Sequence, residues 1–181
     1  MFCLSRLEEP GRASQYKGSA MLTIIETEQL AELLRKATWP LPEPVFHALM
    51  SMSVSVPIEL GVFNEDGHVM LIYRDDSEFK GWHLPGTVLR DNEDVPGAVI
   101  RLVKTEVRAE VSDPKPLGWL ECKRDETPSR HAIALLHTCS LSGIYRNGSM
   151  KAFFDPDALP KDTLQHHKTV IRVIIERLLR L

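Results

Sequence analysis

The sequence predicts an α/β fold in which a mixed β-sheet lies between helices, as an α/β/α sandwich. Two apolar, strand-like runs at 54–63 and 68–74 flank the turn NEDG at 64–67, which is typical of a hairpin. A helical pattern over 94–109 follows a strand and a loop, and a second, amphipathic helical pattern covers 163–181. Hairpins combined with a central and a terminal helix indicate a mixed sheet covered by helices.

The first 52 residues differ in character from the rest. Residues 1–20 are polar and lack periodicity, so we expect a flexible tail, and translation could start at either Met1 or Met21. Leu30, Leu33 and Leu34 recur at helical spacing and predict a helix over 27–37. The run WPLPEP at 39–44 ends this helix because proline cannot continue it, and a second short helix is expected over 45–52. We therefore expect a tail at 1–20, a helical lead-in at 21–52 that packs on the main domain, and that domain at 53–181.

The main domain continues after the hairpin with the segment WHLPG at 82–86. Asp94 is expected to cap the central helix, with Pro96 in its first turn. Apolar runs predict further strands at 116–124 and 131–141. The proline-containing segment FFDPDALP at 153–160 predicts a turn before the terminal helix.

Composition limits the class of function. The formal net charge is −3 and no basic stripe stands out, which argues against a nucleic-acid-coating protein. Three cysteines without a C-x-x-C pair indicate neither a disulfide framework nor a zinc site, so a cytoplasmic location is expected. No 18-residue apolar run is present, and we expect no membrane partner.

The segment from 81 to 107 carries the chemistry that the sequence suggests. Arg101 lies one or two helical turns beyond Glu93, so the two side chains can pair and brace the loop against the helix. Glu106 is the only carboxylate in the helix interior. Mg²⁺ is commonly held by one or two carboxylates together with substrate phosphates. Glu106, with a carbonyl freed by a turn at Gly86, would be a minimal version of such a site.

This segment resembles the signature of the Nudix hydrolase family, G-x5-E-x7-R-E-U-x-E-E-x-G-U, in which U is a bulky aliphatic residue. The family lead-in W-x-x-P-G-G is matched by Trp82, Pro85 and Gly86, with Thr87 in place of the second glycine. Glu93, Arg101, Val103 and Glu106 then fall on signature positions without a gap. The resemblance covers about residues 54–180 and implies the Nudix α/β/α sandwich, Mg²⁺ (or Mn²⁺) as cofactor and a nucleotide as small-molecule substrate. It also implies a homodimer as one option.

Besides Thr87, the chain departs from the signature at three positions. Leu102 and Thr105 replace two glutamates that ligate metal in the family, and Arg108 replaces the last glycine. The segment RLVKTE is similar to the R-L-x-x-A-E of the GDP-mannose mannosyl hydrolases, a branch that keeps one carboxylate and a single Mg²⁺.

That branch also implies roles outside the signature. Its acidic residue in the first strand and its arginine at the end of the next correspond to Glu59 and Arg74, which would contact substrate. Its Gln-His pair, which supplies a metal ligand and the general base, aligns with Asn147 and Gly148, so the base is not identified.

Other titratable residues have weaker claims to a role. His131 and His137 lie on one face of a predicted strand, and we expect a half-buried structural pair, with His131 lining the pocket as the functional alternative. His166 and His167 are expected on the helix surface. The acidic pair at 125–126 is expected in a solvated loop, although it is the nearest acidic source for a missing base.

Two hypotheses follow from the sequence. In the first, the chain is a Mg²⁺-dependent hydrolase of a nucleoside diphosphate linked to another moiety. Gly86 and Glu106 then hold the metal, Arg74 clamps a phosphate oxygen, and Glu106, Arg74 and His131 are the catalytic candidates. Glu93 and Arg101 are structural in this hypothesis. In the second, a Nudix-fold binding or regulatory domain holds a nucleotide without cleaving it.

Overall fold

The structure is a computed structural model that describes residues 22–76, 79–123, 131–142 and 150–181. The tail expected at 1–20 and Met21 lie outside the described residues. The chain divides into two compact units, Met1–Glu43 and Pro44–Leu181. In the described residues no helix has the length and apolar character needed to cross a membrane.

The first unit contains helix α1, Ile24–Lys36, which begins three residues earlier than the sequence pattern predicts. The hydroxyl of Thr23 accepts from the Glu26 N–H at 3.2 Å, and the Glu26 carboxylate accepts from the Thr23 N–H at 2.8 Å. This reciprocal capping box explains the earlier start because it satisfies two amides of the first turn. The expected packing of the helical lead-in on the main domain stays a prediction.

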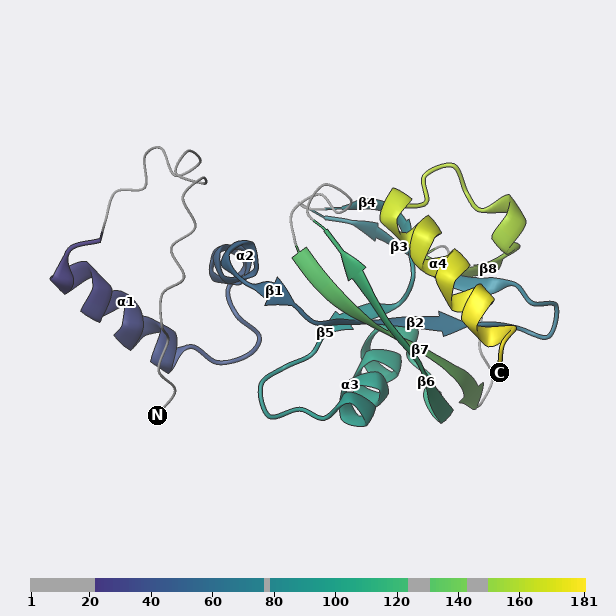
Figure 1. Cartoon of the computed structure of the whole chain (residues 1–181), viewed down its shortest axis with the longest axis horizontal. Helices are drawn as coiled ribbons and strands as arrows, with labels where there is room; N and C mark the ends of the chain where they lie inside the picture. The colour runs from purple at the N-terminus through teal and green to yellow at the C-terminus, as the bar shows by residue number, and fades with distance from the viewer. Residues whose placement is uncertain (1–21, 77–78, 124–130, 143–149) are drawn as a thin grey trace, which may run out of the picture. The chain divides into compact units, whose positions relative to one another are not determined.

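The second unit is built on two sheets (Figure 1). It opens with helix α2, Glu43–Met52, which begins at the boundary between the units. The larger sheet is mixed, with strand order β1-β7-β2-β5 and β6 on the other edge of β7. Strands β1 and β2 run parallel to β7, whereas β5 is antiparallel to β2 and β6 is antiparallel to β7. The strands are β1 Val54–Ser55, β2 Pro57–Val62, β5 Gly86–Val88, β6 Glu110–Cys122 and β7 His131–Ser142.

The smaller sheet is antiparallel, with order β4-β3-β8. Its strands are β3 Val69–Asp75, β4 Lys80–His83 and β8 Lys151–Phe154. Strand β8 corrects the sequence prediction, because Phe153 and Phe154 were expected in a turn. The four residues of β8 are too few to show an alternating pattern, and the turn signal belongs to the short 3₁₀ helix Pro156–Ala158 that follows.

Helices cover the larger sheet on both sides, as predicted. Helix α3, Val95–Leu102, packs its buried side chains against Ile58, Leu60 and Val62 of β2. Helix α4, Gln165–Leu178, packs in a separate apolar cluster with residues of β3, β6 and β7. The other face of β2 points to α4, where a Cβ on Gly61 would lie 2.8 Å from a methyl group of Ile174. Glycine at this position therefore lets α4 lie close to the sheet.

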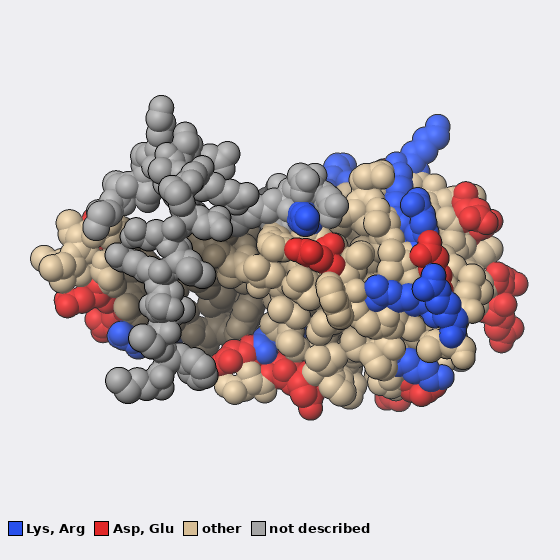
Figure 2. Space-filling view, in the orientation of Figure 1, with Lys and Arg blue, Asp and Glu red and all other residues tan. Residues whose placement is uncertain are grey.

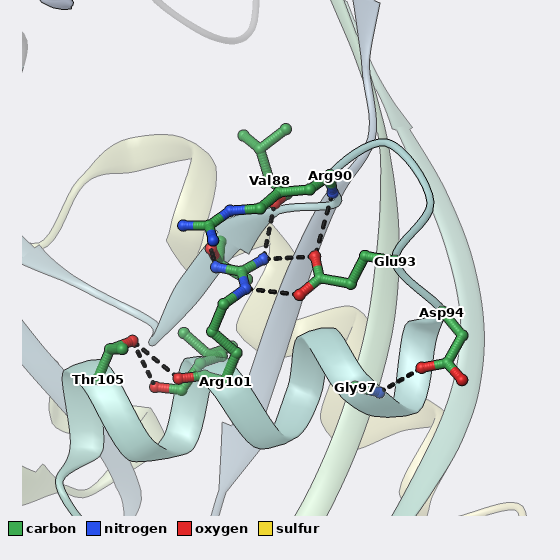
Figure 3. Close-up of polar contacts among 9 residues, drawn as sticks. Val88, Arg90, Glu93, Asp94, Gly97, Arg101 and Thr105 are labelled. Carbon is green, nitrogen blue, oxygen red and sulfur yellow. Dashed lines mark hydrogen bonds and ion pairs between the residues drawn. The ribbon is translucent and has the colours of Figure 1, made fainter. Parts of the chain in front are cut away.

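The central helix differs from its prediction at the C-terminal end. Asp94 caps it as expected, with its carboxylate accepting from the Gly97 N–H at 2.7 Å. The α-helix, expected to reach about 109, ends at Leu102 and continues as a π-helix, η1, over Val103–Val107. The Thr105 hydroxyl donates to the Arg101 carbonyl at 2.8 Å and competes with the backbone ladder of an α-helix at this turn (Figure 3).

Candidate functional site

The site centres on Glu106, which the π-helix directs to the start of β5. One carboxylate oxygen, Oε2, accepts from the Gly86 N–H at 3.2 Å. Burial raises the pKa of Glu106 to about 7, against the lowering effects of the Gly86 hydrogen bond and of the charges on Arg74 and Arg101. A carboxyl group with this pKa is divided between its neutral and charged forms near neutral pH.

A second carboxylate, Glu59 of β2, faces the same place. Its side chain is 13% exposed, and its Oε2 is buried without a hydrogen-bond partner in the described structure. Burial raises the pKa of Glu59 well above its usual value, and the nearby charge of Glu106 raises it further. A carboxylate whose charge is disfavoured by burial and by a neighbouring carboxylate is a natural place for a cation.

Gly86 allows these groups to come together. It pairs with Glu59 in the antiparallel ladder of β2 and β5. A Cβ at Gly86 would lie 3.1 Å from the Glu59 Oε2 and 3.3 Å from the Ile58 carbonyl oxygen. A larger residue would therefore press on the carboxylate, so glycine keeps open the space beside Glu59.

Two buried histidines lie on the α4 side of Glu59: His167 beside the carboxylate, and His83, whose ring centroid is 5.5 Å from that of His167. The Nδ1 atom of His167 lies 3.6 Å from the Glu59 Oε2 and accepts from the Leu84 N–H at 3.4 Å. Burial holds the pKa of His167 well below its usual value, and burial lowers the pKa of His83 to about 4. Both imidazoles are therefore neutral at neutral pH. The expectation that His167 lies on the helix surface was wrong, because the first turn of α4 packs over Glu59.

Arg74 supplies positive charge from the end of β3. Its Nε contacts the Asp76 carboxylate, and its guanidinium lies 4.9 Å from the centroid of the Phe79 ring. Its charge is among the causes that lower the pKa values of Glu106, His83 and His167. Arg74 is thus, like Arg101, a cationic neighbour of Glu106. On the face drawn in Figure 2, basic and acidic side chains are interspersed around α4.

Glu93 and Arg101 lie beside the site and connect the loop to the helix (Figure 3). The Arg101 guanidinium donates from Nε to Oε1 of Glu93 at 2.6 Å and from Nη2 to Oε2 at 2.7 Å. It also donates to the Thr87 hydroxyl at 2.8 Å and to the Val88 carbonyl at 3.1 Å. The contact that the spacing predicts is present, and it extends to both residues that follow Gly86.

The two replaced glutamate positions differ from each other. Leu102 is 0% exposed and packs in the apolar cluster between α3 and β2. Thr105 is exposed and its hydroxyl bonds back to the carbonyls of Arg101 and Leu102. Neither residue offers a ligand to a cation beside Glu106.

The remaining candidates are not brought to this place. His131 bonds to Glu121 at 3.0 Å and pairs with Val54, whereas Glu59 pairs with Leu136, five residues further along β7. Five residues of strand span roughly 16 Å, so His131 does not reach the carboxylates. Asn147, Gly148 and the acidic pair at 125–126 lie outside the described residues.

The donor set fits a weakly held divalent cation. Among the described residues no group of three or more His, Cys, Asp or Glu side chains is arranged to hold a metal ion. Glu59 and Glu106 nevertheless provide two carboxylates, one with a buried, unpartnered oxygen. Mg²⁺ needs no more than this from a protein when substrate oxygens and water complete the octahedron. Sequence reasoning missed His167 and His83 because burial, which distinguishes them, depends on tertiary packing.

Comparison with known proteins agrees with this architecture. The chain matches the NUDIX domain over residues 57–174. Its fold is similar to that of an ADP-ribose pyrophosphatase from Streptococcus suis, with a TM-score of 0.54 and 22% identity over 68% of this chain and 91% of the other. A MutT NUDIX hydrolase from Burkholderia pseudomallei has a TM-score of 0.58 and 21% identity, over 67% of this chain and 98% of that one.

The similarity to a UDP-X diphosphatase covers 84% of this chain and 78% of the other, with a TM-score of 0.58 and 18% identity. No curated protein sequence matches the chain. At these identities the solved structures show a shared fold alone.

Proposed function

The chain belongs to the NUDIX family, and from that premise we propose that it is a divalent-cation-dependent hydrolase of a nucleoside diphosphate linked to another moiety. The observation that carries this proposal is the pair of partly buried carboxylates, Glu59 and Glu106, beside Gly86 and the charge of Arg74. Two structural neighbours, an ADP-ribose pyrophosphatase and a UDP-X diphosphatase, are named for substrates of this class and support it.

In this proposal Glu106 and Glu59, together with the backbone of Gly86, would hold Mg²⁺ or Mn²⁺. When bound there, the ion would supply positive charge that neutralises the pyrophosphate. Arg74 donates hydrogen bonds to a phosphate oxygen and fixes the diphosphate against the carboxylates. Glu93 and Arg101 keep the loop and helix in place, and the neutral imidazole of His167 excludes water from the buried side of Glu59.

The similarity of RLVKTE to the GDP-mannose mannosyl hydrolases makes a nucleotide sugar the first substrate to test. Because the two carboxylates hold a cation weakly, we expect tight metal binding only when a diphosphate is present. This expectation separates the site from a preformed metal cage, which would bind Mg²⁺ in the free protein.

The second candidate is a NUDIX-fold binding or regulatory domain that holds a nucleotide without cleaving it. The observation that favours it concerns the two positions where the family signature has glutamate. Leu102 packs in the core, and the Thr105 hydroxyl donates to a carbonyl of its own helix. A domain of this kind would keep Arg74 and the carboxylate pair as a nucleotide site.

The experiment that decides between the two candidates tests a panel of GDP-mannose, ADP-ribose, UDP-sugars and dinucleoside polyphosphates as substrates, with and without Mg²⁺ or Mn²⁺. Release of phosphate, nucleotide or sugar is measured for wild type, Glu106→Gln and Glu59→Gln. Glu121→Gln is the matched control, since Glu121 bonds to His131 away from the site. We expect cation-dependent turnover that both site variants lose and the control keeps. Cation-dependent binding of a panel member without turnover would favour the second candidate.

A further inference from the structure

Lys151, the first residue of β8, reaches across to the end of the π-helix. Its Nζ donates to the Val107 carbonyl at 2.9 Å and to the Glu106 carbonyl at 3.4 Å. The last carbonyls of a helix have no partner within the helix and need donors from elsewhere. Lys151 supplies such donors at the turn that carries Glu106.

The strand pairing of Lys151 connects this contact to the other side of the site. Strand β8 is antiparallel to β3, and Lys151 pairs with Ile72, two residues before Arg74. The backbone of Lys151 therefore belongs to the strand pair that positions Arg74. Its side chain ends on the helical turn that positions Glu106.

Lys151 therefore links two elements that are distant in sequence. Its bonds are to backbone oxygens, so they act on the position of the turn and not on the charge of the carboxylate. Burial and the charge of Arg108 both lower the pKa of Lys151, and the residue is partly buried.

We propose that Lys151 is a positioning residue, which fixes the backbone of Glu106, and through it the carboxylate, relative to Gly86 and Arg74. The consequence for catalysis rests on the proposed hydrolase function, but the positioning itself does not. The Gly86 N–H, which donates to the Glu106 carboxylate at 3.2 Å, reports on the position of that carboxylate without any substrate or metal.

The test is amide hydrogen exchange of the full chain, measured by NMR without added metal. Lys151→Met keeps the length of the side chain and removes its donors. We expect exchange at Gly86 to become about tenfold faster, which corresponds to roughly 1.4 kcal/mol. Exchange at Leu60, whose N–H donates to the neighbouring Pro85 carbonyl at 3.0 Å, should stay within about twofold of wild type. Glu106→Ala should give the same selective acceleration, because it removes the acceptor itself.

Three further variants complete the set. Lys80→Met is the matched control, since Lys80 lies on β4 of the same sheet and is ion-paired with exposed Asp75. Lys80→Met should leave the exchange rate of the Gly86 amide unchanged. Lys151→Arg restores donors and should return the Gly86 rate to near wild type. The side chain in Lys151→Gln is too short to reach both carbonyls, so this variant should selectively accelerate exchange at Gly86. It provides the same test if Lys151→Met does not fold.

The proposal is overturned if Gly86 exchanges at the wild-type rate in Lys151→Met or Lys151→Gln while Glu106→Ala accelerates it. It is also overturned if Gly86 and Leu60 accelerate equally, because Lys151 would then act on the whole fold. Mn²⁺ affinity in the presence of ADP, measured by electron paramagnetic resonance, adds a functional readout. We expect Lys151→Met to weaken it by at least about tenfold. Absence of Mn²⁺ binding by wild type would count against the proposed hydrolase, whereas the exchange rates would still decide the role of Lys151.

Discussion

Arg101 and Glu93 form a two-bond ion pair, with Nε to Oε1 at 2.6 Å and Nη2 to Oε2 at 2.7 Å. Both side chains are less than one-fifth exposed. The bond to Arg101 lowers the pKa of Glu93, and Glu93 in turn accepts from the Arg90 N–H at 3.1 Å. A planar guanidinium that also bonds to Thr87 and Val88 ties the loop after Gly86 to the helix.

Arg101→Ala should therefore lower the free energy of unfolding by about 1–3 kcal/mol, because it leaves a partly buried carboxylate unpaired. Arg101→Lys should restore only part of the lost free energy of unfolding, since an ammonium group cannot make both hydrogen bonds to the carboxylate in the same geometry. Urea denaturation measures both, with exposed Arg172→Ala as the control for loss of an arginine. A wild-type midpoint for Arg101→Ala would show that the pair does not stabilise the loop.

Arg108→Gly should stabilise the protein. Arg108 ends the π-helix with φ 56° and ψ 46°, a left-handed conformation that costs an ordinary residue about 1–2 kcal/mol and glycine almost nothing. After the entropy that glycine adds to the unfolded chain, we expect a gain of about 0.5–1 kcal/mol in thermal or urea unfolding. Arg108→Ala keeps the Cβ and should show no such gain, so it separates the backbone effect from loss of the arginine charge beside Lys151.

Glu106→Gln should change how stability depends on pH. Because burial raises the pKa of Glu106 from 4.5 to about 7, the folded protein holds a proton between these values that the unfolded chain releases. The contribution of Glu106 to stability is complete below pH 4.5 and is lost as the pH rises through about 7. Glutamine does not titrate, so the variant loses no stability over this range. With a chelator present, the free energy of unfolding of the variant relative to that of wild type should therefore rise by about 3 kcal/mol between pH 4 and pH 8.

This difference must be measured against wild type because other groups oppose it. Burial lowers the pKa of His83 to about 4, so its contribution to stability grows as the pH rises from 4 to 6.5. A constant difference between Glu106→Gln and wild type over this range would mean that burial does not raise the pKa of the Glu106 carboxyl group.

Leu102→Glu should destabilise the fold by about 3 kcal/mol or more, since Leu102 is fully buried in the cluster with Val99 and Leu60. Leu102→Met, which conserves volume, should cost less than about 1.5 kcal/mol. Thr105→Glu should be tolerated because the side chain is exposed. Thermal unfolding with and without Mg²⁺ measures all three. Recovery of Leu102→Glu to wild-type stability by Mg²⁺ would place position 102 at a cation site instead of the core.

The parts of the site that the sequence predicts are those determined over short distances along the chain. The pairing of Glu93 with Arg101, the cap at Asp94 and the strand that carries Glu59 depend on spacing, on capping chemistry and on apolar runs. His167 and Lys151 could not be predicted in the same way. Each acts through a partner more than 40 residues away, and such contacts depend on how α4 and β8 pack against the rest of the domain.

The π-helix at Val103–Val107 also bears on how residues are transferred between proteins by alignment. A π-helix turns through fewer degrees per residue than an α-helix, so side chains beyond Leu102 point in directions that an uninterrupted helix would not give them. Two proteins can then agree letter by letter through this segment while their side chains diverge in space. A substitution borrowed from a relative with a continuous helix would occupy the right number in the chain and face the wrong neighbours.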